Sequence, residues 1–122
     1  MRRHAEEVFT LRDIDLTFNA PDARDAMRLR MDVRRDLLLI FKEAVNNTVR
    51  HSRCSRVSIE LARSGSRLVL EVADDGVGFD TSRESTGQGL ASLRRRADRM
   101  KGTLHIRSAN GAGTTVTLQV PL

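Results

Sequence analysis

The sequence predicts a two-layer α/β (α+β) sandwich, with helices packed on one face of a mixed, mostly antiparallel sheet of about five strands. Several short segments alternate apolar and polar residues, which is typical of strands with one buried face. Two longer segments repeat apolar residues at intervals of three and four, which is typical of helices with one apolar stripe. Elements with a single apolar face bury those faces most economically as two layers.

The composition is that of one globular domain covering residues 1–122. With 39% hydrophobic and 30% charged residues, the chain is long enough to bury a core. Its longest apolar run, residues 37–41, is far too short to cross a bilayer, and no signal peptide is recognisable. The single cysteine, Cys54, excludes an intrachain disulfide and fits a reducing, cytoplasmic compartment. Residues 1–10 are expected to be the tail of an upstream helix or a linker.

The chain is basic, with a net charge of +5 and a pI near 10.9. This charge is compatible with an anionic ligand and equally with a solvated basic surface. Nucleic acid is not expected, because the basic residues are spread along the chain and few aromatic residues can stack on bases. One basic cluster falls opposite the apolar stripe of its helix, where a solvated face is favoured over a docking surface for an acidic partner. This cluster consists of Arg94, Arg95, Arg96, Arg99 and Lys101.

The first half of the chain predicts one strand and one long helix, after a short helical start. Residues 13–18 alternate as a half-buried strand does, and residues 23–31 are expected to be a loop with some helical turn. Asp32 is a suitable N-cap for a helix over residues 33–51. The apolar stripe of that helix consists of Val33, Leu37, Ile40, Phe41, Ala44, Val45 and Thr48.

The second half predicts a hairpin, a helix and two further strands. Residues 57–62 and 67–73 alternate on either side of a short glycine turn, which is typical of an antiparallel hairpin. Apolar residues recur at helical intervals from Leu90, and Gly102 is expected to stop this helix at its C′ position. The last two strands are expected around residues 104–106 and 116–120.

The central motif is Asp74-Asp75-Gly76-Val77-Gly78-Phe79-Asp80, directly after the second hairpin strand. A strand that ends in this way presents an acidic side chain at its tip, and glycines let a ligand approach the main chain closely. The carboxylate of Asp74 could accept a hydrogen bond from the exocyclic amine of adenine. A surface turn is the alternative interpretation, since Asp-Asp-Gly is common in turns.

The long helix offers a polar set beside its apolar stripe. Glu43 and Asn47 lie four residues apart and share a face, and Arg50 and His51 follow one turn later. Amide and carboxylate oxygens suit Mg²⁺, which usually keeps several waters and takes phosphate oxygens as ligands. Arg50 could neutralise phosphate charge. A polar helix flank without a ligand is the alternative.

Two further glycine segments complete the pattern. Gly87-Gln88-Gly89 opens the helix that begins at Leu90, and a helix start with free backbone N–H groups can hold phosphate. Thr114 follows Gly111-Ala112-Gly113 and could support a nucleotide base. Taken alone, the Gly-x-Gly segment favours a simple turn, and threonine is also ordinary in strands.

In combination and in this order, these segments resemble the GHKL ATPase superfamily (HATPase_c), which includes gyrase, heat-shock chaperone, histidine kinase and mismatch-repair ATPases. The resemblance covers about residues 10–122 and implies the Bergerat-type ATP-binding fold. The short loop between the two glycine motifs and the ending at residues 114–122 are most similar to the catalytic ATP-binding domain of a bacterial two-component sensor histidine kinase. The most similar kinases are those that pair with helix-turn-helix response regulators of the nitrate-regulator type.

The resemblance implies a role for each matching residue. Asn47 would hold Mg²⁺, Glu43 would orient that site or activate a nucleophile, and Arg50 and His51 would touch phosphate or ribose. Asp74 would read the adenine amine with support from Thr114. The glycine motifs would shape the pocket and hinge the ATP lid, through Gly76, Gly78, Phe79, Gly87, Gly89 and Leu90.

The function implied is transfer of the γ-phosphate of ATP to a histidine on a separate dimerisation domain, for relay to a response regulator. His4 has too little chain before it to lie on the expected helical hairpin, so this chain alone should not phosphorylate itself. The parent protein would be a homodimer with a possible membrane anchor.

Two alternatives stay open. The four-residue spacing of Glu43 and Asn47 is also that of GHKL ATP hydrolases and anti-sigma-factor serine kinases. The second alternative is a degenerate domain that serves only in protein interaction.

Overall fold

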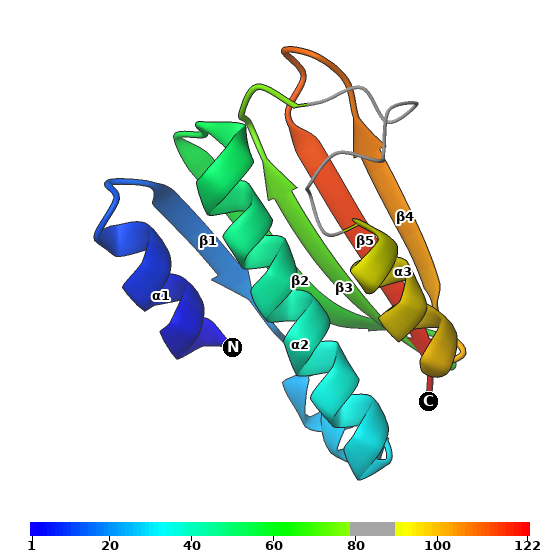
Figure 1. The fold of residues 1–122 in the computed structure, drawn as a ribbon. Helices are drawn as coiled ribbons and strands as arrows, with labels where there is room; N and C mark the ends of the chain where they lie inside the picture. Colours follow the sequence, from blue (N-terminus) through cyan, green and yellow to red (C-terminus); the bar gives the residue numbers. More distant parts are fainter. Residues whose placement is uncertain (79–89) are drawn as a thin grey trace.

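The computed structural model describes residues 1–78 and 90–122, so Phe79, Gly87 and Gly89 of the predicted site lie outside the described residues. In the described part, five strands form one mixed sheet in the order β1-β2-β3-β5-β4 (Figure 1). Only the β1–β2 pair is parallel, and the other three pairs are antiparallel. The strands are β1 (Asp15–Asn19), β2 (Arg56–Ser64), β3 (Arg67–Asp74), β4 (Thr103–Ser108) and β5 (Thr114–Pro121).

Three α-helices of the described chain lie on one face of this sheet (Figure 1), which confirms the predicted two-layer architecture. They are α1 (Arg2–Thr10), α2 (Met31–Asn47) and α3 (Leu90–Arg99). A 3₁₀ helix, η1 (Ala23–Arg28), precedes α2, and a π-helical turn, η2 (Thr48–Ser52), continues from it. No helix among the described residues is long and apolar enough to cross a membrane.

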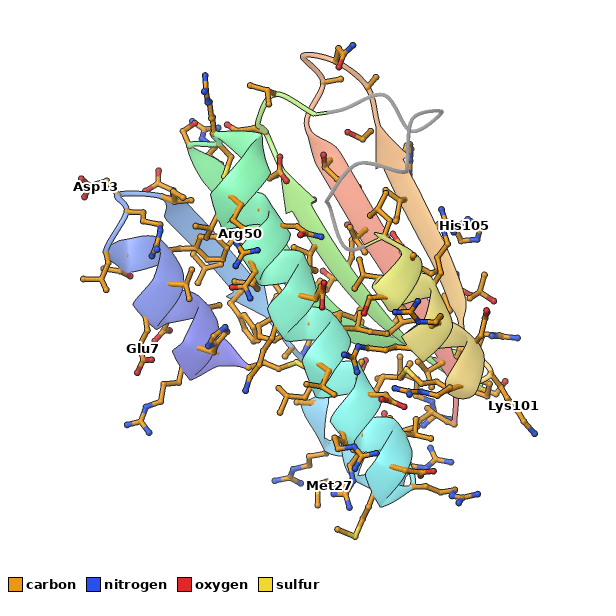
Figure 2. The ribbon with its side chains drawn as sticks, in the orientation of Figure 1. Glu7, Asp13, Met27, Arg50, Lys101 and His105 are labelled. Carbon is orange, nitrogen blue, oxygen red and sulfur yellow. The ribbon has the colours of Figure 1, made fainter. Side chains whose placement is uncertain are left out.

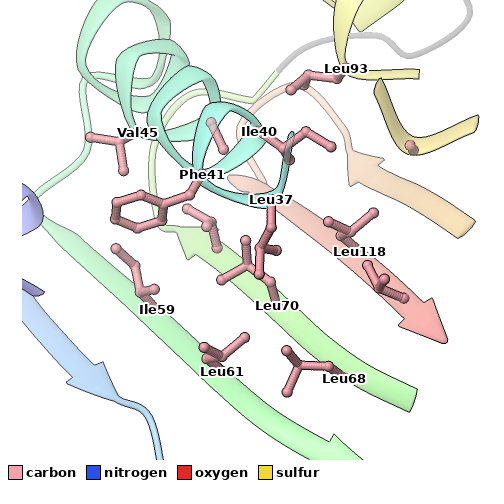
Figure 3. Close-up of a cluster of buried hydrophobic side chains, with 14 of the residues drawn as sticks. Leu37, Ile40, Phe41, Val45, Ile59, Leu61, Leu68, Leu70, Leu93 and Leu118 are labelled. Atoms are coloured by element: carbon pink, nitrogen blue, oxygen red, sulfur yellow. The ribbon is translucent and has the colours of Figure 1, made fainter. Parts of the chain in front are cut away.

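The core fills the space between α2 and the sheet (Figure 3). The expected apolar stripe of α2 faces the inward residues of β2, β3 and β5, and alternation along the strands decides which residues point inward. Burial of each large side chain contributes roughly 1.5–3 kcal/mol relative to exposure. The residues that meet there, each at most 3% exposed, are Leu37, Ile40, Phe41, Val45, Ile59, Leu61, Leu68, Leu70 and Leu118.

The start of α2 corrects one prediction. Arg30, not Asp32, is the N-cap residue, with an extended backbone and no capping side-chain bond. Asp32 lies inside the first turn, where its carboxylate accepts a hydrogen bond from the N–H of Val33 at 2.9 Å and lies 3.4 Å from the guanidinium of Arg30. An acidic residue is favourable in the first turn because it faces the positive end of the helix dipole.

The end of α2 also differs from the predicted single helix over 33–51. The α-helix stops at Asn47, and residues 48–52 form the π turn η2. The Thr48 hydroxyl donates to the carbonyl of Ala44 at 3.1 Å, while the Thr48 N–H points to the carbonyls of both Ala44 and Val45. Such bonding by a threonine hydroxyl loosens the regular ladder. The left-handed backbone of Arg53, at φ +50°, then ends the helical segment.

The end of α3 shifts the predicted stop by one residue. Lys101 occupies the left-handed C′ position at φ +56°, and Gly102 follows it. The Gly102 N–H bonds to the carbonyl of Ala97 at 2.9 Å and the Lys101 N–H to that of Asp98 at 3.0 Å, which is the Schellman pattern. Glycine is required at 102 for space, since a Cβ there would lie 2.8 Å from the carbonyl oxygen of Gln119.

Candidate functional site

Asp74 lies at the C-terminal end of β3 on the helix-covered face of the sheet. Its direct partners are Val57 on β2 and Thr114 on β5. Residues directly opposite each other in antiparallel strands share a face, and Val57 is buried in the core. Asp74 and Thr114 are both partly buried, and they lie on the same face as the apolar core residues, at the edge where that face becomes polar.

The carboxyl group of Asp74 is oriented by its own turn. One carboxylate oxygen accepts a hydrogen bond from the N–H of Gly76 at 2.9 Å. Burial raises the pKa of Asp74, and the charge of Asp75 acts in the same direction, while hydrogen bonds from the backbone N–H groups of Gly76 and Thr114 oppose the rise. The result is a partly desolvated carboxyl group whose hydrogen bonds strengthen as water is excluded.

Asp75 has a different environment although it is the next residue. Its carboxylate accepts hydrogen bonds from the N–H of Ser55 at 2.9 Å, the hydroxyl of Ser55 at 2.8 Å and the N–H of Arg56 at 2.9 Å. These bonds, that from Arg56 first, lower the pKa of Asp75. Asp75 thus ties the turn after β3 to the start of β2, a role that the sequence pattern did not reveal.

Two glycines bring the turn after β3 against the β4–β5 loop. Gly78 has φ +65°, and a Cβ there would overlap the carbonyl oxygen of Ala109. Gly113 has φ +74°, and a Cβ there would overlap the carbonyl oxygen of Asp74. Two main chains that approach this closely leave no room for side chains. These glycines therefore hold the wall of the site beside Asp74.

Thr114 belongs to a hydroxyl pair that was not predicted. The hydroxyls of Thr114 and Ser108 lie 2.8 Å apart, and the Ser108 hydroxyl also donates to the carbonyl of Gly113 at 2.9 Å. Since a serine hydroxyl has a single proton, this arrangement makes Thr114 the donor within the pair. Ser108 thereby orients the Thr114 side chain, and no spacing rule in the sequence linked the two residues.

The polar set of α2 lies at the same end of the molecule. The C-terminal ends of α2 and β3 both point toward the upper part of Figure 1. Glu43 and Asn47 are partly buried on α2, and Arg50 is exposed in the π turn that follows (Figure 2). His51 also belongs to that turn. π turns inside helices often accompany functional sites.

Leu90 begins α3 and is only 5% exposed, so its side chain belongs to the core. Its backbone stands at the helix start, where N–H groups have no partner within the helix.

A depression of about 510 Å³ also reaches the end of β3, but from the uncovered face of the sheet. Thr17, Ser58 and Ala73 line it and pair with one another in register. Because Ala73 and Asp74 are successive strand residues, their side chains point to opposite faces. This depression is therefore not the side of the sheet on which Asp74 and Thr114 meet.

The comparisons with known proteins identify the family to which this fold belongs. The family model of histidine kinase-, DNA gyrase B- and HSP90-like ATPases matches residues 32–122. Sensor protein VraS of Staphylococcus saprophyticus is 38% identical over 87 residues, covering 70% of this chain and 25% of its own length. Sensor histidine kinase LiaS of Bacillus subtilis is 36% identical over 87 residues, which cover 70% of this chain and 24% of the length of LiaS. The chain therefore spans about a quarter of these relatives.

Solved structures show the same fold. The histidine kinase domain of the Erythrobacter litoralis EL346 blue-light activated kinase superposes with a TM-score of 0.80 at 22% identity, covering 99% of this chain and 58% of that one. Acinetobacter baumannii histidine kinase AdeS superposes with a TM-score of 0.74 at 17% identity, and the match covers 98% of this chain and 59% of the AdeS chain. With the family match over most of its length, the chain belongs to the histidine kinase-, DNA gyrase B- and HSP90-like ATPases, and it corresponds to the ATPase catalytic domain of histidine kinases.

Proposed function

We propose that this chain binds ATP with Mg²⁺ and donates the γ-phosphate to a histidine on a separate dimerisation domain of a two-component sensor kinase. The observation that carries the proposal is the position of Asp74. It is a partly buried, oriented carboxyl group on the helix-covered face, beside Thr114 and at the end of the molecule where α2 presents Glu43 and Asn47. Relay to a response regulator of the nitrate-regulator type and a homodimeric parent protein belong to the same proposal.

The adenine end of the site is assigned to β3 and β5. The carboxylate of Asp74 accepts a hydrogen bond from the exocyclic amine of adenine, whereas guanine would present a carbonyl oxygen there. Thr114 supports the base, and its hydroxyl is already aligned by Ser108. Gly76, Gly78 and Phe79 shape the pocket around the base. Because the carboxyl group is partly desolvated, a mismatch leaves it unpaired and weakens binding.

The phosphate end is assigned to α2 and to the start of α3. Asn47 and Glu43 supply the hard oxygen atoms that suit Mg²⁺. Among the described residues, no group of three or more His, Cys, Asp or Glu side chains could enclose a metal ion. Mg²⁺ usually takes one or two protein ligands and keeps waters and phosphate oxygens. Arg50 and His51 meet phosphate or ribose, and Gly87, Gly89 and Leu90 provide backbone N–H groups.

Phosphoryl transfer needs mainly positioning and neutralisation of charge. Arg50 supplies positive charge toward the phosphates, Asn47 supplies a neutral amide oxygen for Mg²⁺, and Glu43 orients the magnesium site or accepts a proton from the nucleophile. The acceptor histidine comes from another domain, so the isolated chain should not incorporate phosphate from labelled ATP.

The first prediction tests the adenine contact. Calorimetry should show Mg-ATP binding by the wild-type chain in the micromolar to sub-millimolar range, about 5–8 kcal/mol. Asp74→Asn should weaken it by about tenfold to a hundredfold, since a hydrogen bond to a charged group contributes about 1.5–3 kcal/mol.

Glu71→Gln is the matched control for Asp74→Asn. Glu71 lies on the same strand but is exposed on the other face, so the same chemical change there should leave ATP affinity within about twofold. No binding by the folded wild-type chain would refute the proposed function. Equal losses in both variants would refute the assigned role of Asp74.

A further inference from the structure

The basic cluster of α3 is not simply a solvated face. The guanidinium of Arg99 lies 2.8 Å from a carboxylate oxygen of Asp36 on α2, and that of Arg96 lies 4.0 Å from the same oxygen. Asp36 is only 6% exposed. We refer to Asp36, Arg96 and Arg99 as the Asp36 clamp. It joins α2 to α3 at the ends where α2 begins and α3 finishes (Figure 1).

The position of Asp36 on α2 relates the clamp to the proposed phosphate end. Residues 43 and 47 lie seven and eleven positions after Asp36, so at about 100° per residue the side chains of Glu43 and Asn47 leave the helix within about 20° of the direction of Asp36, one on either side of it. The side of α2 that faces α3 at Asp36 is therefore the side that carries Glu43 and Asn47. Along the helix axis they lie about 10 Å and 16 Å beyond Asp36.

The direction of α3 completes the argument. α3 runs antiparallel to α2, so its first residue, Leu90, lies toward the end of α2 that carries Asn47 (Figure 1). The clamp joins the far end of the helix pair, and α3 begins toward the end of α2 that carries Glu43 and Asn47. A shift of α3 at the clamp would change the distance between its N-terminal backbone N–H groups and Asn47.

The exposure of the three side chains indicates how much the ion pairs of the clamp contribute to stability. Side-chain exposure is 9% for Asp36 but 60% for Arg99, so the pair is partly screened and its contribution to stability is modest. Arg96 is less exposed, at 27%, and its Nε is buried without a hydrogen-bond partner in the described part of the chain. Packing therefore holds Arg96, and Arg99 supplies the directed bond. A buried carboxylate needs such a partner.

We infer that the Asp36 clamp is a positioning device that sets the separation of α2 and α3, and so tunes binding of the phosphate groups of ATP rather than of its adenosine part. The inference rests on the proposed function and deepens it. Asp36, Arg96 and Arg99 act through the helices, and none of them is assigned a contact with nucleotide.

The test compares Mg-ATP and adenosine as probes on the wild-type chain, Arg99→Gln and Arg95→Gln. Arg95 lies on the same helix and is exposed, so its variant removes the same charge without touching Asp36. We expect Arg99→Gln to weaken Mg-ATP binding about tenfold, equivalent to about 1.4 kcal/mol. Adenosine binding should stay within about twofold. Arg95→Gln should leave both affinities near the wild-type values, and Arg99→Lys should restore most of the ATP affinity.

Each other outcome overturns the inference in a recognisable way. Equal loss of ATP affinity in Arg95→Gln and Arg99→Gln would mean that only long-range charge matters. Equal loss of ATP and adenosine affinity would mean general destabilisation. If Arg99→Gln fails to fold, Asp36→Asn, which keeps the side-chain size, is measured instead, and wild-type ATP affinity in that variant refutes the clamp. A wild-type chain that binds neither probe refutes the proposed function and the inference together.

Discussion

At the scale of single residues, the two adjacent carboxylates after β3 have opposite surroundings. Burial raises the pKa of Asp74, whereas hydrogen bonds from Arg56 and Ser55 lower that of Asp75. Asp74 is partly desolvated and oriented, which suits ligand binding, and Asp75 is bonded to the preceding hairpin strand, which suits structure. The sequence pattern indicated an acidic pair. The different roles of the two residues became visible only from the neighbours that each carboxylate contacts in the folded chain.

Asp75→Ala should make the free energy of unfolding depend less on pH in the acidic range. In the wild-type chain the folded pKa of Asp75 lies below its ordinary value of 3.8, so the folded state binds fewer protons than the unfolded state. This stabilisation is present above about pH 3.8 and is lost as the pH falls through the lowered pKa. Urea unfolding of both proteins between pH 7 and pH 3 measures this. At pH 7 the urea midpoint of Asp75→Ala should be lower than that of the wild-type chain, and it should fall less as the pH is lowered.

Glu60→Ala is the control for that experiment, since Glu60 is an exposed carboxylate on β2. Its removal should leave the acid dependence of the wild-type chain in place. A midpoint at pH 7 unchanged by Asp75→Ala would contradict the role assigned to the hydrogen bonds from Ser55 and Arg56.

At the scale of elements, both main helices end where the predictions were least accurate. The apolar periodicity of α2 continues past Asn47, but the α-helix stops at that residue and residues 48–52 form a π turn. At α3 the glycine was expected to adopt the left-handed conformation, but Lys101 adopts it and Gly102 is needed for close contact with β5. Helix ends depend on neighbours that periodicity does not describe.

Lys101→Gly should stabilise the chain by about 1 kcal/mol, because a left-handed backbone costs a residue with a Cβ roughly 1–2 kcal/mol and costs glycine little. Urea unfolding of wild type, Lys101→Gly and Lys101→Ala measures this directly. Lys101→Ala keeps the strain and removes the charge, so it should change stability little. If alanine stabilises as much as glycine, the charge of Lys101 and not its backbone is the cause.

At the scale of the whole molecule, one apolar layer between α2 and the sheet holds the site in place. Leu118 on β5 is fully buried in this layer and pairs directly with Leu70 on β3 and Leu104 on β4 (Figure 3). β3 ends at Asp74, and its neighbour β5 begins at Thr114. Core packing therefore fixes the register that brings these two residues together.

Leu118→Ala should lower the free energy of unfolding by about 2–5 kcal/mol, because it leaves a cavity in a closely packed core. Leu11→Ala is the matched control, since Leu11 is 84% exposed, and it should change stability by less than about 0.5 kcal/mol. Chemical denaturation monitored by circular dichroism measures both. Equal effects of the two substitutions would contradict the position assigned to Leu118.

The sequence by itself determined the layers, the order of helices and strands, and the short-range motifs, because alternation and helical periodicity are local properties that burial imposes directly. Asp74, Glu43 and Asn47 were recognisable in this way, as parts of strand and helix patterns. Only the tertiary structure decided that β1 pairs in parallel with β2, that Ser108 aligns Thr114, and that Arg99 reaches Asp36 across 63 residues. These relations join residues whose proximity depends on how the layers pack, and no local period encodes that packing.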